Sequence, residues 1–304
     1  MYDVVVVGKA NLDYLVRGPR LPAPGQSLGG DEFQEAAGGK GANQAVGAAR
    51  LGARVALVAR IGKDPRGDAV LAKLHDEGVE TRFITRDPEA PTGVALCQVG
   101  GSGEKQILSA AGANARLTAS CVRQAASAFT SAKVLLCQLG APLEAVWEAI
   151  RLAKSARALV MLDPGPPAPV SDDLIAQLDL IRPNASEARM LTGIAVCDRA
   201  SAREAARDLL RRGAKAAAVQ AGEHGDVLLS RDREVWLPRL EVKRVDATGA
   251  GDAFASALAV WLAEGKPLEE AGLFASAAAA LSTTVLGAQA SLPHRAAVLQ
   301  LLSR

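Results

Sequence analysis

The chain has 304 residues, of which 49% are apolar and 22% charged, and its formal net charge is only +2. This length allows one large α/β domain or two ordinary ones, and either can bury a substantial core. The Lys and Arg residues are scattered, which argues against a nucleic-acid partner or a membrane-binding face. The composition is that of an ordered globular protein.

The N-terminus and the cysteines indicate a compartment. Met1 is followed at once by apolar residues, without a basic leader or a stretch of membrane-spanning length, so we expect a cytoplasmic protein. The four cysteines lie far apart, without zinc or disulfide spacing, at Cys97, Cys121, Cys137 and Cys197. We expect all four to be reduced residues of the core.

The first predicted element is a central strand. Tyr2 to Val7 is a β-branched run closed by Gly8, typical of a strand that is covered on both faces in a parallel sheet. Asn11 and Asp13 follow it. Ligands of open α/β sheets bind beyond the carboxyl ends of strands, so these two side chains can hydrogen-bond sugar hydroxyls. A turn stabilised by their side chains is an equal alternative.

Two segments, at about residues 12–37 and 92–110, interrupt the α/β pattern. The first is punctuated by Pro and Gly, and the second contains alternating runs over 93–99 and 105–110 around a Gly-Gly-Ser-Gly turn, a hairpin signal. We expect the two segments to pair into one small sheet. As a lid over the active site, this sheet would exclude water that competes for a phosphoryl group.

A glycine-rich turn, Gly38-Gly39-Lys40-Gly41-Ala42-Asn43, lies between these segments and precedes an Ala-rich helix that ends near Leu51. The glycines allow close approach of the backbone to a ligand, and Lys40 and Asn43 offer hydrogen-bond donors. The turn lacks the spacing and the final Ser/Thr of a P-loop. This excludes a Walker nucleotide site at this position.

The middle of the chain alternates between apolar runs and helical periodicity. The strands are expected at 55–60, 134–138, 159–163 and 216–220, and the helices at 69–77, 143–153 and 202–212. This predicts a doubly wound, mostly parallel central sheet flanked by helices, in one domain over residues 1–304. The turns at 163–166 and 182–184 end apolar runs and belong at the edge of the sheet that carries the site.

Near the C-terminal end, Asp246-Ala247-Thr248-Gly249-Ala250-Gly251-Asp252 precedes a buried helix over 253–262. The turn leaves unpaired N–H groups beside the positive end of the helix dipole, which suits a phosphate. We expect these groups to keep Asp252 ionised, so that it can accept a proton from a hydroxyl. An anion-binding turn plus a base suits phosphoryl transfer to an alcohol, although a lone G-x-G-D also fits a simple helix cap.

The turns at 38–43 and 246–252 together resemble the two signatures of the PfkB carbohydrate kinase family, and within it the ribokinases most closely. The resemblance extends along the chain through residues 8–13, 92–95, 183–187, 191–193 and 287–289. It implies a ribokinase-like fold and ATP-dependent phosphorylation of a primary hydroxyl, foremost O5 of D-ribose. It also implies a homodimer formed through the lid, which covers exposed strand edges.

The resemblance assigns roles residue by residue. The implied catalytic residues are the base Asp252 and an anion hole made by the backbone amides of Gly249, Ala250 and Gly251. The implied sugar-binding residues are Asn11, Asp13, Gly39, Lys40, Gly41, Asn43 and Asp252. The implied ATP-binding residues are Asn184, Gln220, Ala221, Gly222, Glu223, His224, Gly225, Gly251 and Ser276.

Two cations are implied by the same resemblance. Mg²⁺ is organised by Glu187 through water, although an acidic residue in the first turn of a helix is the plainer interpretation of this residue. K⁺ or another monovalent activator is held mainly by backbone carbonyls of Asp246, Thr248, Ser282, Val285, Gly287 and Ser291. His224 is expected to be a loop residue without a catalytic role.

One position departs from the family. Gly140 stands where ribokinases carry a Glu that contacts the sugar, so deoxyribose, another sugar, a sugar acid or a nucleoside is an alternative substrate. Lys9 would favour an acidic sugar unless it is simply exposed, and a nucleoside base has only Tyr14 and Phe33 for stacking. A sugar-binding regulator without activity is a further alternative, opposed by the intact Gly-Ala-Gly-Asp turn. A nicotinamide-dependent dehydrogenase also fits the α/β pattern, but this sequence lacks the G-x-G-x-x-G motif after its first strand.

Overall fold

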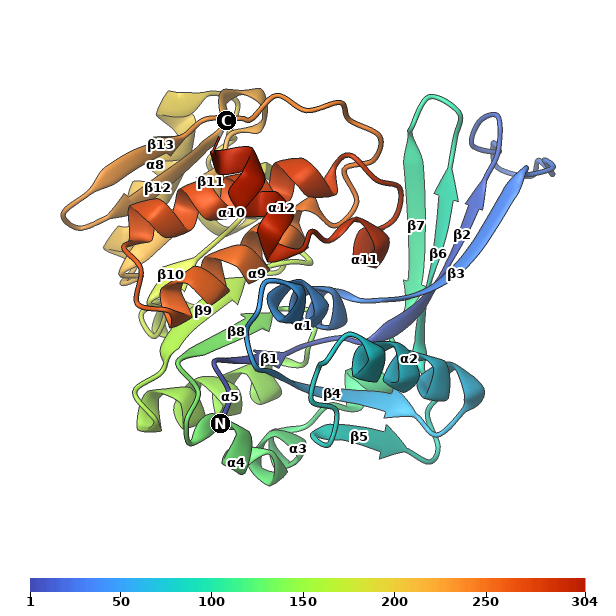
Figure 1. Ribbon diagram of the computed structural model, residues 1–304, viewed down its shortest axis with the longest axis horizontal. Helices are drawn as coiled ribbons and strands as arrows, with labels where there is room; N and C mark the ends of the chain where they lie inside the picture. The colour runs from blue at the N-terminus through green and yellow to red at the C-terminus, as the bar shows by residue number, and fades with distance from the viewer. Residues whose placement is uncertain (304) are drawn as a thin grey trace.

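The computed structural model describes residues 1–303. Its central sheet contains β1 (Val4–Val7), β4 (Val55–Gly62), β5 (Ile84–Asp87), β8 (Val134–Gln138), β9 (Leu159–Asp163), β10 (Leu180–Ile181), β11 (Ala216–Gln220), β12 (Asp226–Ser230) and β13 (Glu234–Leu237). The strand order is β13-β12-β11-β10-β9-β8-β1-β4-β5 (Figure 1). All neighbouring strands are parallel except the antiparallel pairs β11–β12 and β12–β13. The predicted doubly wound, mostly parallel sheet is confirmed.

Helices cover both faces of this sheet. One face carries α1 (Lys40–Arg50), α2 (Pro65–Asp76), α9 (Ala250–Ala263), α10 (Leu268–Ser282) and α12 (Arg295–Leu302). The other carries α3 (Ala119–Gln124), α4 (Ala126–Phe129), α5 (Leu143–Ser155), α6 (Asp172–Ile175), α7 (Ala185–Thr192) and α8 (Arg199–Arg211). Strand β1 shows why two cores form: Val4 and Val6 are buried in one, and Val5 and Val7 in the other, because successive side chains alternate between faces.

A second sheet of four strands projects from one side of the body (Figure 1). It contains β2 (Asn11–Arg17), β3 (Glu32–Gly38), β6 (Gly93–Val99) and β7 (Lys105–Ala110), in the order β3-β2-β6-β7. The parallel pair β2–β6 joins the two segments that interrupt the α/β pattern. Asn11 and Asp13 lie in β2, so the chain passes from the central strand to the projecting sheet within a few residues.

The helix starts differ from the apolar periodicity. Helix α2 begins at Pro65, where Asp64 accepts a hydrogen bond from the Gly67 amide, and α8 begins at Arg199 behind a capping box at Asp198. Helix α9 begins at Ala250. Polar capping residues therefore decide the starts of α2 and α8, and a glycine N-cap precedes α9, whereas the periodicity marks only the buried part of each helix.

The prediction for the cysteines is partly wrong. All four are free, and Cys121 and Cys137 are buried. Cys97 is only partly covered, because it lies in the projecting sheet, and Cys197 is exposed in the loop between α7 and α8. Among residues 1–303, no helix combines the length and the apolar character that crossing a bilayer requires.

Candidate active site

Asp252 lies where the two glycine-rich turns meet. It is in the first turn of α9 and is 6% exposed. Its Oδ2 accepts a hydrogen bond from Asn43 Nδ2 at 2.8 Å, and its Oδ1 accepts one from Gln44 Nε2 at 2.9 Å. Both donors lie in the first turns of α1, so segments from opposite ends of the chain position one carboxylate.

The pKa of Asp252 is raised, chiefly because the group is buried, and the nearby charge of Asp163 adds to the shift. The charge of Lys40 and the hydrogen bonds from Asn43 and Gln44 act in the opposite direction. The cost of burying a charge therefore outweighs the groups that favour ionised Asp252. A raised pKa brings a carboxylate closer to the range that suits a general base near neutral pH.

Backbone amides without protein partners lie beside Asp252. Gly249 adopts φ 86°, a left-handed conformation that favours glycine, and is the N-cap of α9. The amides of Gly249 and Gly251 donate to no acceptor in residues 1–303, whereas the Ala250 amide makes a long hydrogen bond of 3.3 Å to the Ala247 carbonyl. The helix end therefore presents unpaired donors to an anion.

Asn11 and Asp13 approach from the projecting sheet. Asn11 is buried, and its Oδ1 accepts a hydrogen bond from Asn114 Nδ2 at 2.9 Å. Asp13 Oδ1 is buried without a hydrogen-bond partner. The pKa of Asp13 is raised to about 6 by burial and by the charge of Asp252, against a smaller effect of Asn11. A buried acceptor without a donor is a natural site for a substrate hydroxyl.

Three neighbouring glycines fit the turn against this site. A Cβ at Gly38 would lie 1.9 Å from Asp13 Oδ2, so no larger residue fits there without displacing the carboxylate. Gly39 is the N-cap of α1 and Gly41 lies in its first turn, and both pack against the backbone that follows β1. The turn therefore places the start of α1 beside Asp13.

Lys40 makes an ion pair on the body side of the site. Its Nζ lies 3.0 Å from both carboxylate oxygens of Asp163, at the end of β9. Burial disfavours the charged lysine, but the carboxylates of Asp163, Asp252 and Glu187 outweigh this effect and raise its pKa. Gln44 Nε2 also donates to Asp163 Oδ2 at 2.7 Å. Lys40, Gln44 and the two aspartates thus form one buried network.

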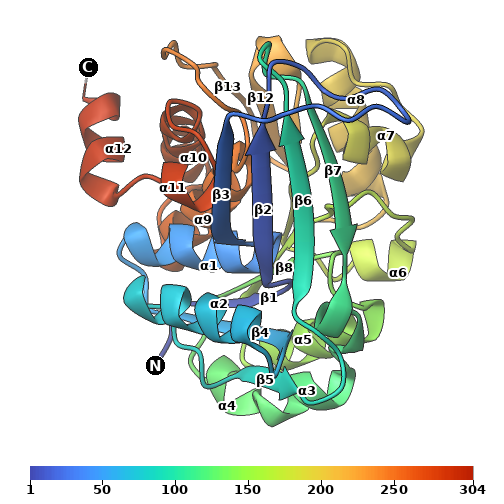
Figure 2. The ribbon, with the colours of Figure 1, turned by 90° about the vertical axis from the view of Figure 1, so that its right-hand side faces the viewer.

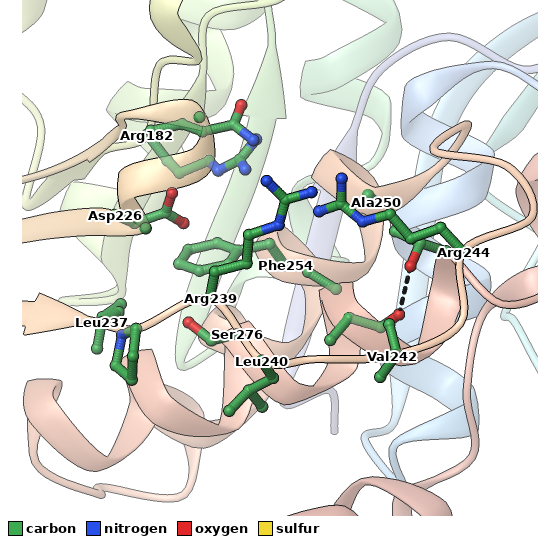
Figure 3. A pocket seen from close by; sticks show the side chains of 17 residues that line it. Arg182, Asp226, Leu237, Arg239, Leu240, Val242, Arg244, Ala250, Phe254 and Ser276 are labelled. Carbon is green, nitrogen blue, oxygen red and sulfur yellow. Dashed lines mark hydrogen bonds between the residues drawn. The ribbon is translucent and has the colours of Figure 1, made fainter. Parts of the chain in front are cut away.

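A pocket opens on the other side of the start of α9 (Figure 3). Ala250 lines this pocket. So do four of the predicted nucleotide-binding residues, namely Gln220, Gly222, Gly225 and Ser276. Glu223 and His224 are exposed and Ala221 is buried, and none of the three lines this pocket. Their assignment to nucleotide stays a prediction.

Asn184 and Glu187 form a capping box at the start of α7. Asn184 Oδ1 accepts a hydrogen bond from the Glu187 amide, and Glu187 Oε2 accepts one from the Asn184 amide, both at 2.9 Å. Burial and the charge of Asp163 raise the pKa of Glu187, and Lys40 opposes the shift. Glu187 Oε1 and Lys40 Nζ both approach Gly165. A Cβ built on this glycine would lie 2.6 Å from each atom, so the two side chains are neighbours. Glu187 is therefore a helix-capping residue that also faces the site.

The predicted monovalent-cation residues lie on two joined loops and at two helix ends. Asp246 and Thr248 precede α9, Val285 and Gly287 follow α10, and Ser282 and Ser291 end α10 and α11 (Ala288–Ser291). Asp246 accepts hydrogen bonds from the Thr248 amide at 2.9 Å and from the Gly287 amide at 3.0 Å. The backbone carbonyls of Asp246, Thr248 and Val285 accept no hydrogen bond from residues 1–303. The hydroxyls of Ser282 and Ser291 donate to carbonyls within their own helical turns. Unpaired carbonyls on joined loops suit a weakly hydrated cation.

Sequence reasoning missed three groups. Asn114 is buried and donates to Asn11 Oδ1 while its own Oδ1 accepts from the Ala10 amide. Gln44 directly follows Asn43, the last residue of the recognised turn, and this position was a signal that could have identified it as a site residue. Arg182 lines the pocket. It begins the turn over 182–184 that the sequence placed at the site edge of the sheet, but no role was assigned to its side chain.

Comparisons with known proteins identify the family. Residues 1–295 match the family described as pfkB family carbohydrate kinase. The ribokinase of Haemophilus influenzae is 38% identical, with 98% of each chain covered, and the deoxyribokinase of Salmonella typhi is 34% identical over 96% of this chain and 95% of its own. The structure of Arabidopsis thaliana ribokinase complexed with ribose and ATP matches with a TM-score of 0.89 and 32% identity, covering 100% of this chain and 99% of that one. The chain therefore belongs to the pfkB family of carbohydrate kinases.

Proposed function

We propose that this carbohydrate kinase transfers the γ-phosphoryl group of ATP to O5 of D-ribose. The observation that carries the proposal is Asp252, held by Asn43 and Gln44 next to the unpaired amides of Gly249 and Gly251. The ribokinase relatives support ribose as the sugar, and the ribose and ATP of the Arabidopsis complex support the pair of substrates.

The geometry supports a direct transfer. Asn11, Asp13 and Asn43 would orient the sugar through hydrogen bonds, and Asp252 would accept the proton of the O5 hydroxyl as O5 attacks the γ-phosphorus. The bond from that phosphorus to the bridging oxygen of ADP then breaks. The amides of Gly249 and Gly251, together with the dipole of α9, would stabilise the charge on the transferred oxygens.

Mg²⁺ fits the site as a metal that keeps most of its water. No cluster of three metal-binding side chains occurs in residues 1–303, so the protein would supply one or two carboxylates, Glu187 and Asp163, through water. When bound, the metal neutralises phosphate charge. The free Oε1 side of Glu187, facing Lys40, is where this contact would form.

We infer a monovalent-cation site at the joined loops that carry Asp246 and Val285. Their free carbonyls fit K⁺, and the charge of a bound cation would favour the anion at the start of α9. Activity in potassium buffer should exceed activity in a buffer of a large organic cation. Equal activities would contradict the site.

We also infer that residues 1–304 form one kinase domain whose projecting sheet acts as a lid and as a dimer interface. Figure 2 shows the four strands of this sheet side by side, on the side of the molecule that faces the viewer. The register places four exposed apolar side chains on one face of the sheet, opposite to the face that carries Asp13: Val16, Phe33, Leu96 and Leu108. Phe33 is 62% and Leu108 73% exposed. A second copy of the chain would cover this face and the open edge of β7.

A second candidate is a kinase for an acidic sugar, favoured by Lys9. A Cβ at Gly140 would lie 2.8 Å from Lys9 Cε, so the lysine occupies the space beside this glycine. The pKa of Lys9 is lowered by burial, and no carboxylate of residues 1–303 pairs with it. A half-buried cation without a partner favours an anionic substrate group.

A coupled assay of ADP formation tests the function. Ribose, deoxyribose, fructose, sugar acids and nucleosides are compared, and ribose is expected to give the highest kcat/KM. Asp252→Asn should lower kcat by orders of magnitude while ADP binding is kept, and Asp232→Asn, in an exposed turn, is the matched control. Near-normal turnover of Asp252→Asn would refute the base. Ribose binding without ADP formation in the wild type would instead favour a regulator.

A further inference from the structure

Arg182 is buried beside the start of α9. It follows β10 and is 4% exposed, although arginine is seldom buried without a partner. Its guanidinium carbon lies 4.8 Å from the centre of the Phe254 ring. A Cβ at Gly251 would lie 2.9 Å from Arg182 Nη1. The guanidinium therefore packs against the turn that presents the unpaired amides.

No protein acceptor satisfies this guanidinium. Within residues 1–303 its N–H groups make no hydrogen bond, and no carboxylate oxygen lies within 4.0 Å. Burial raises the pKa of Asp226 and Arg182 opposes the shift, while Arg182 is also among the charges that lower the pKa of Glu187. Its charge thus acts on carboxylates on both sides without pairing with either.

The location is unfavourable for a cation unless an anion is present. The N-terminus of a helix carries partial positive charge, so a guanidinium beside it is repelled, and both are stabilised by one bound anion. Arg182 lines the pocket that also contains Gln220 and Ser276. Figure 3 shows the side chains of Arg239 and Arg244 reaching into the same pocket from the opposite wall. The pocket therefore suits a ligand with several negative charges.

We propose that Arg182 binds the phosphate chain of the nucleotide and stabilises the transferred phosphoryl group. This assignment rests on the proposed function. As the bond from O5 to the γ-phosphorus forms, the O5 proton passes to Asp252, and the bond to the bridging oxygen breaks with its electron pair leaving on ADP. Arg182 donates to phosphate oxygens that gain charge during this step, alongside the amide of Gly251.

Nucleotide binding separates this role from a purely structural one. We compare the affinities of ATP, ADP and adenosine, measured by titration calorimetry without sugar, for the wild type, Arg182→Lys, Arg182→Met and the exposed control Arg231→Met. Arg182→Met should weaken ATP and ADP about tenfold to a hundredfold and leave adenosine unchanged, since only the phosphates lose a charged hydrogen bond. Arg182→Lys should bind ATP and ADP more tightly than Arg182→Met but should not restore the wild-type kcat. An ammonium keeps the charge but lacks the planar guanidinium that donates two parallel hydrogen bonds.

Two results would overturn the assignment. One is an equal loss of affinity for adenosine and ADP, which would place Arg182 against the base or in the fold. The other is an unchanged nucleotide affinity and an unchanged kcat in Arg182→Lys. This variant keeps the positive charge and much of the side-chain volume, so it can be measured even if Arg182→Met does not fold. Because these titrations need no sugar, a failure of ribose as substrate leaves them readable. A selective loss of ADP affinity would then support Arg182 while the sugar assignment fails.

Discussion

Gln44 Nε2 donates to Asp252 Oδ1 at 2.9 Å while the same nitrogen donates to Asp163 Oδ2 at 2.7 Å. One neutral amide thus bridges two buried carboxylates and offsets part of their mutual repulsion. The charge of Asp163 already raises the pKa of Asp252. The protonation of the proposed base is therefore sensitive to the residue at position 44.

Gln44→Glu should move the acidic limb of the pH profile of kcat/KM to higher pH by about one unit or more, because a third carboxylate disfavours ionised Asp252. The substitution is nearly isosteric, so folding should be kept. The exposed Gln300→Glu is the control, with an unchanged profile. If Gln44→Glu lowers kcat but leaves the acidic limb of the pH profile where it is in the wild type, Gln44 acts only by packing.

Asp13 predicts a pH dependence of stability. Its pKa of about 6 in the folded state lies above its ordinary value of 3.8, so the folded chain holds this proton more tightly than the unfolded chain. The resulting stabilisation is present below about pH 4 and is lost as the pH rises through 6. Urea unfolding between pH 4 and 7 should show Asp13→Asn gaining stability relative to the wild type as the pH rises. Parallel profiles would contradict the raised pKa.

Lys105 connects the projecting sheet to the loop before α9. Its Nζ donates to Thr248 Oγ1 at 2.6 Å and lies 3.7 Å from Asp246 Oδ1. Lys105→Met should speed amide exchange in β7 and raise the KM for the sugar by less than about fivefold, since exposed charged contacts are weak. Lys243→Met, an exposed lysine without an ion pair, is the control. Unchanged exchange would mean that this contact does not hold the sheet.

The apolar face of the projecting sheet predicts self-association. Leu108 is paired with Leu96 across β6 and β7 and is 73% exposed. Leu108→Lys should convert a dimer into a monomer, because burying an unpaired ammonium in an apolar interface is costly. Sedimentation equilibrium measures the mass of both proteins. A wild type that is monomeric at high concentration would contradict the interface.

Much of the fold could be predicted because local patterns coincide with tertiary burial. The strands over 134–138, 159–163 and 216–220 have the predicted bounds, since each is a continuous apolar run buried in the sheet. The antiparallel pair β12–β13 was not predicted. Strand β13 lies at the edge of the sheet, where one side is open and the apolar signal is weaker, whereas β12 is paired on both sides.

The site was predictable where its residues belong to one turn. Asp252 and Asn43 each lie in a glycine-rich segment, and the structure joins these segments by a hydrogen bond. Asn114 was not predictable, because its contacts are with groups far along the chain that only the folded sheet brings together. Arg182 lies in a turn that was predicted at the site edge, but its contacts with Gly251 and Phe254 were not predictable, for the same reason. The raised pKa of Asp252 was not predictable for the same reason, since burial is a property of the whole packing.

The proposed reaction divides acceptor recognition and proton removal between two parts of the molecule. Asp13 is carried by β2 of the projecting sheet, whereas Asp252 is fixed to α9 in the body. If the sheet acts as the proposed lid, an outward movement would separate the two carboxylates, and a single water molecule is too small to contact both. Only a polyol long enough to contact both carboxylates would hold the two parts together, so the length of the acceptor would itself limit ATP hydrolysis.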